Sequence, residues 1–176
     1  MPEPTIAELL DEYERAIGYT DSLWIDLRDD QITWRPHEES SAIGWHLGHQ
    51  AAVTHYMIRN LTAAEALIDP ELDALMDSAT AEADRGELPG RERLAAYRDT
   101  VAERVRFRIT NIDNGNVGAP AQLRIIAHTL LTATINHEYQ HSKWIGEVRL
   151  DAHGSDLPPD PVSRHLRVVD GYFVIG

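Results

Sequence analysis

Residues 120–150 read PAQLRIIAHTLLTATINHEYQHSKWIGEVRL, and they carry the longest helical pattern in the chain. Apolar, aromatic and histidine residues, with one threonine, recur in this segment at the spacing of one face of an α-helix. The recurring residues are Leu123, Ile126, Ala127, Leu130, Thr134, His137, His141, Trp144, Ile145 and Val148. A long helix with one apolar face gains most of its stability by burying that face against other helices.

Three other segments show the same periodicity, and they cover about residues 5–27, 40–60 and 91–111. Thr5, with Glu8 three positions later, matches a capping box, and Ser40 or Ser41 is expected to cap the second segment. No convincing strand alternation occurs before residue 160. The sequence therefore predicts an all-α fold, a four-helix bundle over about residues 5–150.

The other segments are interpreted as connections and a tail. Residues 61–90 are less regular and partly acidic, which is typical of a surface excursion, with a short helix expected at residues 70–76. Glycine and prolines soon after residue 150 exclude a longer helix, and residues 166–175 are expected to be extended. We expect one domain over residues 1–176, in which residues 151–176 form an irregular or extended tail.

The composition excludes several classes of function. The chain has 176 residues, of which 43% are hydrophobic and 26% charged, as in an ordinary globular domain. Its 16 basic and 29 acidic residues give a formal net charge of −13, so neither nucleic acid nor an anionic membrane surface is an expected partner. The absence of cysteine excludes disulfides and thiolate metal sites.

The chain also lacks the usual signals for export or membrane insertion. Its first residues, MPEPTIAELLDEYER, carry acids where a secretory signal has a basic region. No apolar run approaches the roughly 18 residues that a membrane span requires. We therefore expect a soluble, cytoplasmic protein.

Three histidines fall on the apolar faces of two predicted helices. At 100° per residue, His141 lies about 40° from His137, within the face that also holds Leu130 and Ile126. In the second segment His49 lies about 40° from Trp45, again along the apolar face. His128, in contrast, lies opposite His137 and is expected to be solvated. Imidazoles from two helices are therefore predicted to point into one core.

Two interpretations of these histidines are open. A single inward histidine is usually a core residue whose ring nitrogens bind neighbouring polar groups. Three of them on faces with few other polar residues would lack such partners, and burying unpaired polar rings costs a few kcal/mol each. Two histidines one helical turn apart, with a third from a facing helix, instead suit a divalent metal with open coordination positions. Zinc, nickel and ferrous iron all accept nitrogen ligands.

The segment from His137 to His141 also matches the H-E-x-x-H pattern of zincin metallopeptidases, in which Glu138 would be the base. Zincins take a third ligand downstream, but residue 147 is Glu147, and only His153 and His165 follow. The sheet expected to hold a peptide substrate is missing as well. His49 is therefore the better third ligand, and a zincin-like peptidase is the alternative.

The segments WHLGH, residues 45–49, and HEYQH, residues 137–141, together resemble the DinB/YfiT-like superfamily. The pairing is also similar to the N-terminal domain of ergothioneine-biosynthesis sulfoxide synthases. The resemblance covers about residues 5–150 and implies four helices connected up-down-down-up, with a divalent metal held by three histidines. Carried over by position, these are His49, His137 and His141.

The resemblance further implies a metal-dependent enzyme acting on a small molecule, such as a transferase of low-molecular-weight thiols (mycothiol, bacillithiol or glutathione) or a hydrolase. It also implies a homodimer. A non-enzymatic alternative treats the metal as a staple in a helical binding or stress protein.

Several residues flank the predicted site. Glu138 lies about 100° from His137, on the flank of the predicted site. Three roles are open for it: a catalytic acid/base, a residue that orients a ligand histidine, or a solvated side chain. Arg98 lies near the buried face of residues 91–111 and is expected to be a snorkelling side chain paired with acids, with a substrate carboxylate clamp as the alternative. His46 and Gln140 are expected to be surface residues near the rim of the site. The aromatic residues near the site are expected to belong to the core, and they are Trp45, Tyr56 and Trp144.

Overall fold

The computed structural model describes residues 3–81, 84–154 and 156–176. Within these ranges the chain forms six helices and one two-stranded sheet. The elements are α1 (Ile6–Ser22), α2 (Asp29–Ile32), α3 (Ile43–Ile58), α4 (Pro70–Leu75), α5 (Arg91–Asp113), α6 (Pro120–His153), β1 (Leu166–Val169) and β2 (Tyr172–Ile175). The predicted helical fold class is confirmed, with the sheet as a small addition.

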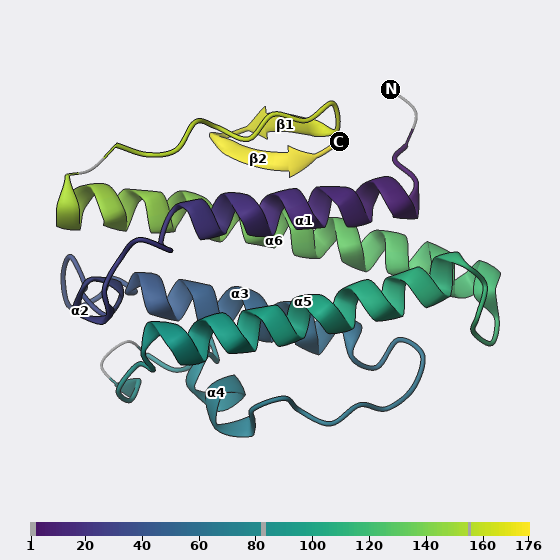
Figure 1. Cartoon of the computed structure of the whole chain (residues 1–176), viewed down its shortest axis with the longest axis horizontal. Helices are drawn as coiled ribbons and strands as arrows, with labels where there is room; N and C mark the ends of the chain where they lie inside the picture. Colours follow the sequence, from purple (N-terminus) through teal and green to yellow (C-terminus); the bar gives the residue numbers. More distant parts are fainter. Residues whose placement is uncertain (1–2, 82–83, 155) are drawn as a thin grey trace.

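The four long helices α1, α3, α5 and α6 pack around one core. Helix α1 runs along α6, and α3 contacts both α5 and α6 (Figure 1). Each helix contributes a leucine without solvent exposure, namely Leu9, Leu47, Leu94 and Leu131. Because burying such a side chain contributes about 1.5–3 kcal/mol, packing of the apolar faces holds the helices together.

Helix α1 begins as predicted and ends earlier than predicted. Thr5 Oγ1 accepts a hydrogen bond from the backbone N–H of Glu8, and the Glu8 carboxylate accepts one from the Thr5 N–H, which completes the capping box. The helix ends at Ser22, although the apolar pattern continues to Leu27. Arg149 explains this break, because its guanidinium donates to the Leu23 carbonyl at 2.8 Å and holds the turn that follows.

Helix α3 is not capped by a serine, so that prediction is wrong. The helix follows Ala42, which has no side-chain cap, and Ser41 Oγ instead accepts a hydrogen bond from Arg85. Helix α5 begins at Arg91 as predicted. Helix α6 continues past residue 150 until Gly154, whose φ of 56° lies in the left-handed region that glycine tolerates.

The 61–90 segment is more than a surface excursion. Its predicted short helix forms as α4, with the Asp69 carboxylate accepting from the Leu72 N–H at 3.0 Å. Leu72 and Met76 are each 1% exposed. The segment therefore adds apolar side chains to the core beside α3.

The tail folds back as a β-hairpin. Strands β1 and β2 pair antiparallel, with Leu166 opposite Ile175, and lie along α1 and α6 (Figure 1). The Ile175 N–H donates to Asn136 Oδ1 of α6 at 2.7 Å, and the Tyr172 ring meets the Trp144 ring edge to face. None of the helices in the described ranges combines the length and apolarity needed to cross a bilayer.

Candidate metal centre

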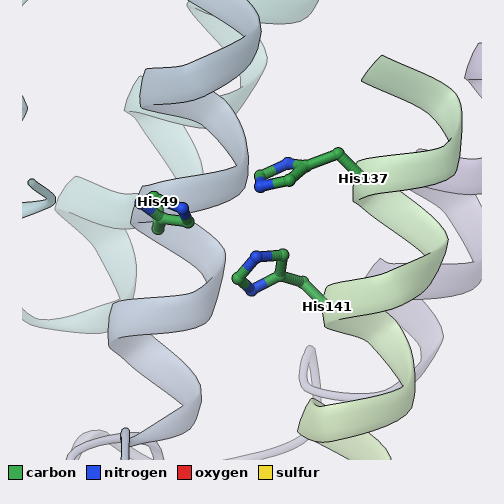
Figure 2. Close-up of side chains that lie close together, drawn as sticks. All are labelled: His49, His137 and His141. Carbon is green, nitrogen blue, oxygen red and sulfur yellow. The ribbon is translucent and has the colours of Figure 1, made fainter. Parts of the chain in front are cut away.

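The structure brings the three predicted histidines together. Helix α3 supplies His49, and α6 supplies His137 and His141, which lie one turn apart on the face turned toward α3 (Figure 2). Each ring offers one nitrogen, and these nitrogens all lie within 4.8 Å of one another. His49 and His141 are buried, and His137 is partly buried. The predicted convergence of two helices is therefore present, while metal binding itself stays a prediction.

The ring of His49 is oriented from outside the cluster. Its Nδ1 donates to the Met76 carbonyl at 2.7 Å, which leaves Nε2 as the unprotonated nitrogen. The ring also stacks on Trp45, with centroids 4.5 Å apart and planes at 12°. On the Trp45 ring lies the guanidinium carbon of Arg85, 3.7 Å from the ring centroid. A backbone carbonyl and an aromatic stack thus fix both the tautomer and the plane of His49.

His46 lies next to the cluster, contrary to the prediction that it is a surface residue. It is 7% exposed, and its Nδ1 lies 2.9 Å from Nδ1 of His141. With Nδ1 of His141 as the donor and Nδ1 of His46 as the acceptor, Nε2 of His141 is the unprotonated nitrogen that is available to a ligand. His46 therefore orients His141 in the way that Met76 orients His49.

The structure explains why helical angles misplaced residues on α3. The helix contains no Asp, Glu, Lys or Arg, which is typical of a helix buried on most sides, so its margins are buried too. His46 lies on such a margin. Tyr56, predicted as a core aromatic, is 73% exposed near the end of the same helix, while Trp45 is buried as predicted. The missing charge was the signal that could have identified His46.

Burial keeps the clustered histidines neutral. Desolvation lowers the pKa of His46 to about 3 and that of His137 to about 4, and it lowers the pKa of His49 and His141 as well. The neighbouring rings contribute to this lowering of the pKa for His46, His137 and His141, since each disfavours a second positive charge. Neutral imidazole is the form that binds metal ions, so the cluster is ready for a cation at neutral pH.

The cluster fits a first-row divalent cation. Nδ1 of His137 is buried without a hydrogen-bond partner in the described part of the chain, whereas buried polar atoms are nearly always paired. A tetrahedral ion with bonds of about 2.0–2.1 Å places its ligand nitrogens about 3.4 Å apart. The all-nitrogen donor set suits zinc, nickel or ferrous iron.

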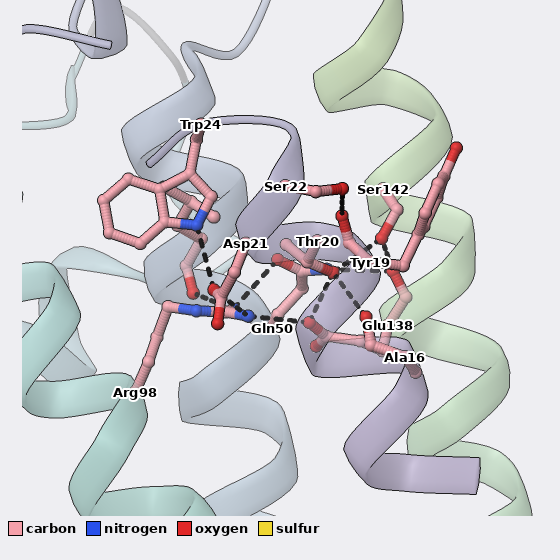
Figure 3. A network of polar contacts seen from close by, with 11 residues as sticks. Ala16, Tyr19, Thr20, Asp21, Ser22, Trp24, Gln50, Arg98, Glu138 and Ser142 are labelled. Atoms are coloured by element: carbon pink, nitrogen blue, oxygen red, sulfur yellow. Dashed lines mark hydrogen bonds and ion pairs between the residues drawn. The ribbon is translucent and has the colours of Figure 1, made fainter. Parts of the chain in front are cut away.

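Glu138 lies in a buried polar network beside the cluster (Figure 3). It is 3% exposed, so the solvated interpretation is wrong. Its Oε1 accepts hydrogen bonds from Arg98 at 2.8 Å and from Thr20 Oγ1 at 2.7 Å. Arg98 also lies 3.7 Å from the Asp21 carboxylate. The predicted pairing of Arg98 with acids is confirmed, but at 6% exposure its guanidinium does not snorkel to solvent.

Every predicted ligand is followed in sequence by a member of this network. Gln50 follows His49, Glu138 follows His137, and Ser142 follows His141. The amide of Gln50 and the hydroxyl of Ser142 both donate to the Glu138 carbonyl at 2.8 Å. One residue along a helix is a rotation of about 100°, so all three polar side chains point away from the cluster together. The network therefore ties α3 to α6 at the level of the histidines.

The chain offers little support for a zincin site. Glu147, at the position of the zincin ligand, is exposed on α6. His153 Nδ1 lies 3.4 Å from the amide of Gln31, far along the helix from His137. Within the described ranges the sheet is the hairpin after α6, so no strand precedes the motif.

Comparison with known proteins identifies a family. A family model described as the DinB superfamily matches residues 12–145, most of the chain, including all three histidines. No curated protein matches the chain at a significant level.

Proposed function

The chain belongs to the DinB superfamily, and on this basis we propose that it is a metal-dependent enzyme acting on a small molecule. His49, His137 and His141 are the proposed ligands of one divalent cation. The observation that carries the proposal is the set of three neutral imidazole nitrogens within 4.8 Å of one another. Three protein ligands leave positions open for substrate or water, as in catalytic rather than structural metal sites.

The proposed reaction is transfer of a low-molecular-weight thiol to a small electrophile, or hydrolysis of a small molecule. The bound cation would lower the pKa of a thiol or a water molecule, so that an anionic nucleophile is available at neutral pH. The protein's own part is to hold the rings in position. Met76 and Trp45 hold His49, and His46 holds His141.

We assign Glu138 a positioning role rather than that of a catalytic base. Its Oε1 is already bonded to Arg98 and Thr20, and its neighbours in the network follow the other two ligands. Glu138→Gln should therefore lower metal affinity while the pH dependence of the activity stays unchanged. Loss of one limb of the pH profile in this variant would instead make Glu138 an acid/base.

The experiment that tests the proposal combines metal analysis with a thiol screen. Protein purified without tag or chelator is analysed for bound metal and then incubated with mycothiol, bacillithiol or glutathione and an electrophile such as chlorodinitrobenzene. We expect about one metal ion per chain. We also expect one of the three thiol compounds to be consumed in the presence of the electrophile, and only when the metal is bound. His37→Ala is the matched control for ligand variants, because His37 is an exposed histidine that is not part of the cluster.

The rival functions predict different results. A zincin-like peptidase would keep its metal in His49→Ala, whereas the proposed site would lose it. A metal staple would lower the melting temperature on metal removal and would consume neither thiol nor electrophile.

Further parts of the proposal rest on family membership and sequence. We propose that the four long helices are connected up-down-down-up, that they and the tail form one domain, and that the protein is a cytoplasmic homodimer. Light scattering on the purified protein measures its molar mass and so tests the expected homodimer directly.

A further inference from the structure

A pocket of about 430 Å³ lies against His49, between α3 and α4. Its size is typical of small-molecule sites. His49 forms part of its wall, so the pocket and the proposed metal site share this histidine. The pocket also contains an unusual set of charged and polar side chains from the end of α3 and from α4.

Three buried polar atoms without partners belong to residues that line this pocket. They are Nε2 of His55, Nε of Arg59 and Oδ2 of Asp73, and none has a hydrogen-bond partner among the residues that the structure describes. His55 is only 2% exposed. Because buried polar atoms are nearly always paired in folded proteins, three such atoms on residues around one cavity indicate groups that a ligand would satisfy once their side chains turn toward it.

The pocket contains one residue of each charge, Arg59 and Asp73. Arg59 makes no ion pair within the described ranges, although its neighbours Arg104 and Arg108 both bind the carboxylate of Glu65. Asp73 is held by Tyr97, whose hydroxyl donates to its Oδ1 at 2.5 Å, while its buried Oδ2 has no hydrogen-bond partner among the described residues. The Arg59 guanidinium contacts the Tyr56 ring, with its carbon 6.0 Å from the ring centroid, but neither it nor the Asp73 carboxylate has an ion-pair partner among the described residues. Two opposite charges of this kind in one pocket match a ligand that carries both charges.

We propose that this pocket binds the α-amino-acid head group of the substrate, with its carboxylate on Arg59 and its ammonium on Asp73. The neutral ring of His55 supplies a further hydrogen bond to the head group. Asp77 also lines the pocket, but it is exposed and its Oδ1 already accepts from the Ala79 N–H. The inference rests on the proposed function, because it assumes that the reacting end of the same molecule lies toward His49.

Three small thiols separate the two charges of the head group. L-cysteine carries both groups, 3-mercaptopropionate carries the carboxylate alone, and cysteamine carries the ammonium alone. Binding of each to the cobalt-loaded full chain is measured by calorimetry. The near-ultraviolet absorption of a cobalt–thiolate bond is recorded in the same samples.

We expect L-cysteine to bind most tightly of the three. Arg59→Met should weaken L-cysteine and 3-mercaptopropionate about 10- to 100-fold and leave cysteamine unchanged, since a hydrogen bond to a charged group is lost. Asp73→Asn should weaken L-cysteine and cysteamine and leave 3-mercaptopropionate unchanged. Arg59→Lys, which keeps the charge, should recover part of the affinity.

Matched controls are Arg124→Met on α6 and Glu71→Gln on α4, which remove charges outside the pocket and should change no affinity. Asn retains an acceptor for the Tyr97 hydroxyl, and the melting temperature of each variant reports on its folding. Two results would overturn the inference: affinities that do not respond to Arg59 or Asp73, or no binding of any probe at millimolar concentration. Charge-dependent binding without a cobalt–thiolate band would support the head-group site while contradicting the proposed thiol chemistry.

Discussion

A methyl group at Gly48 would collide with Met76, so Gly48→Ala tests how the His49 ring is oriented. A Cβ at this position would lie 2.5 Å from both Sδ and Cε of Met76 and 3.0 Å from its Cγ. Met76 is only 1% exposed, so its side chain has little room to move away. A shift of Met76 would also displace the carbonyl that accepts the hydrogen bond of His49 Nδ1.

The expected effect on stability is small because two terms oppose each other. Overpacking a core site costs about 1–3 kcal/mol, whereas alanine is favoured over glycine inside a helix by about 1 kcal/mol. The free energy of unfolding should therefore fall by about 0–2 kcal/mol. The effect on metal binding should be larger, since losing a hydrogen bond that orients a ligand histidine lowers metal affinity about 10- to 100-fold.

The assay is a zinc titration against a chromogenic chelator, with urea unfolding of the same samples. Gly18→Ala is the matched control, because Gly18 is also in a helix but is exposed and has no atom within 4 Å of an added Cβ. This control should gain about 0.5–1 kcal/mol of stability and bind zinc like the wild type.

Unchanged zinc affinity in Gly48→Ala would refute the claim that Met76 orients His49. The same substitution in a Met76→Ala variant gives a second test. Met76→Ala removes the colliding atoms but keeps the backbone carbonyl, so adding Gly48→Ala to it should have little further effect on zinc affinity.

Three further predictions concern stability. In the metal-free protein the free energy of unfolding should fall as pH is lowered from 7 to 5, as urea titrations would measure. Burial lowers the pKa of His46 to about 3 and that of His137 to about 4 from 6.5, so the unfolded chain binds more protons below pH 6.5. Each such histidine contributes a slope of up to about 1.4 kcal/mol per pH unit, and a flat profile would contradict the burial of these rings. Arg98→Met should lower the free energy of unfolding, measured in urea, by about 3–5 kcal/mol, because the buried Glu138 carboxylate loses its cationic partner. Adding Glu138→Leu should restore part of this loss, and a double variant whose loss is the sum of the two single losses would argue against the buried pair. Asn136→Ala should raise amide exchange in the hairpin while the core of α6 keeps its protection, and unchanged exchange at Ile175 would disprove the contact.

The helices and the three histidines could be predicted because they depend on local periodicity. An amphipathic pattern reports which side of a helix is buried, and His137 and His141 lie well inside that side of α6. The same reasoning failed on α3, where nearly every side is covered. His46 therefore became a buried neighbour of His141, and Tyr56 lies exposed near the helix end.

The partners of the site could not be predicted because they come from distant segments. The carbonyl of Met76 reaches His49 only because α4 packs on α3, and no local pattern reports that contact. The pairing of Glu138 with Arg98 likewise depends on how α5 and α6 pack. The sequence did carry a weaker signal for the buried polar network. Each predicted ligand histidine is followed directly by a polar residue, and this repeated pattern is not needed if those residues only face solvent.

The most direct test of the metal centre is a crystal structure of zinc-loaded protein with diffraction data collected at the zinc absorption edge. We expect one anomalous peak per chain, at about 2.0–2.1 Å from one nitrogen each of His49, His137 and His141. A peak bound by the two α6 histidines without His49, or a vacant cluster in crystals grown with excess zinc, would contradict it.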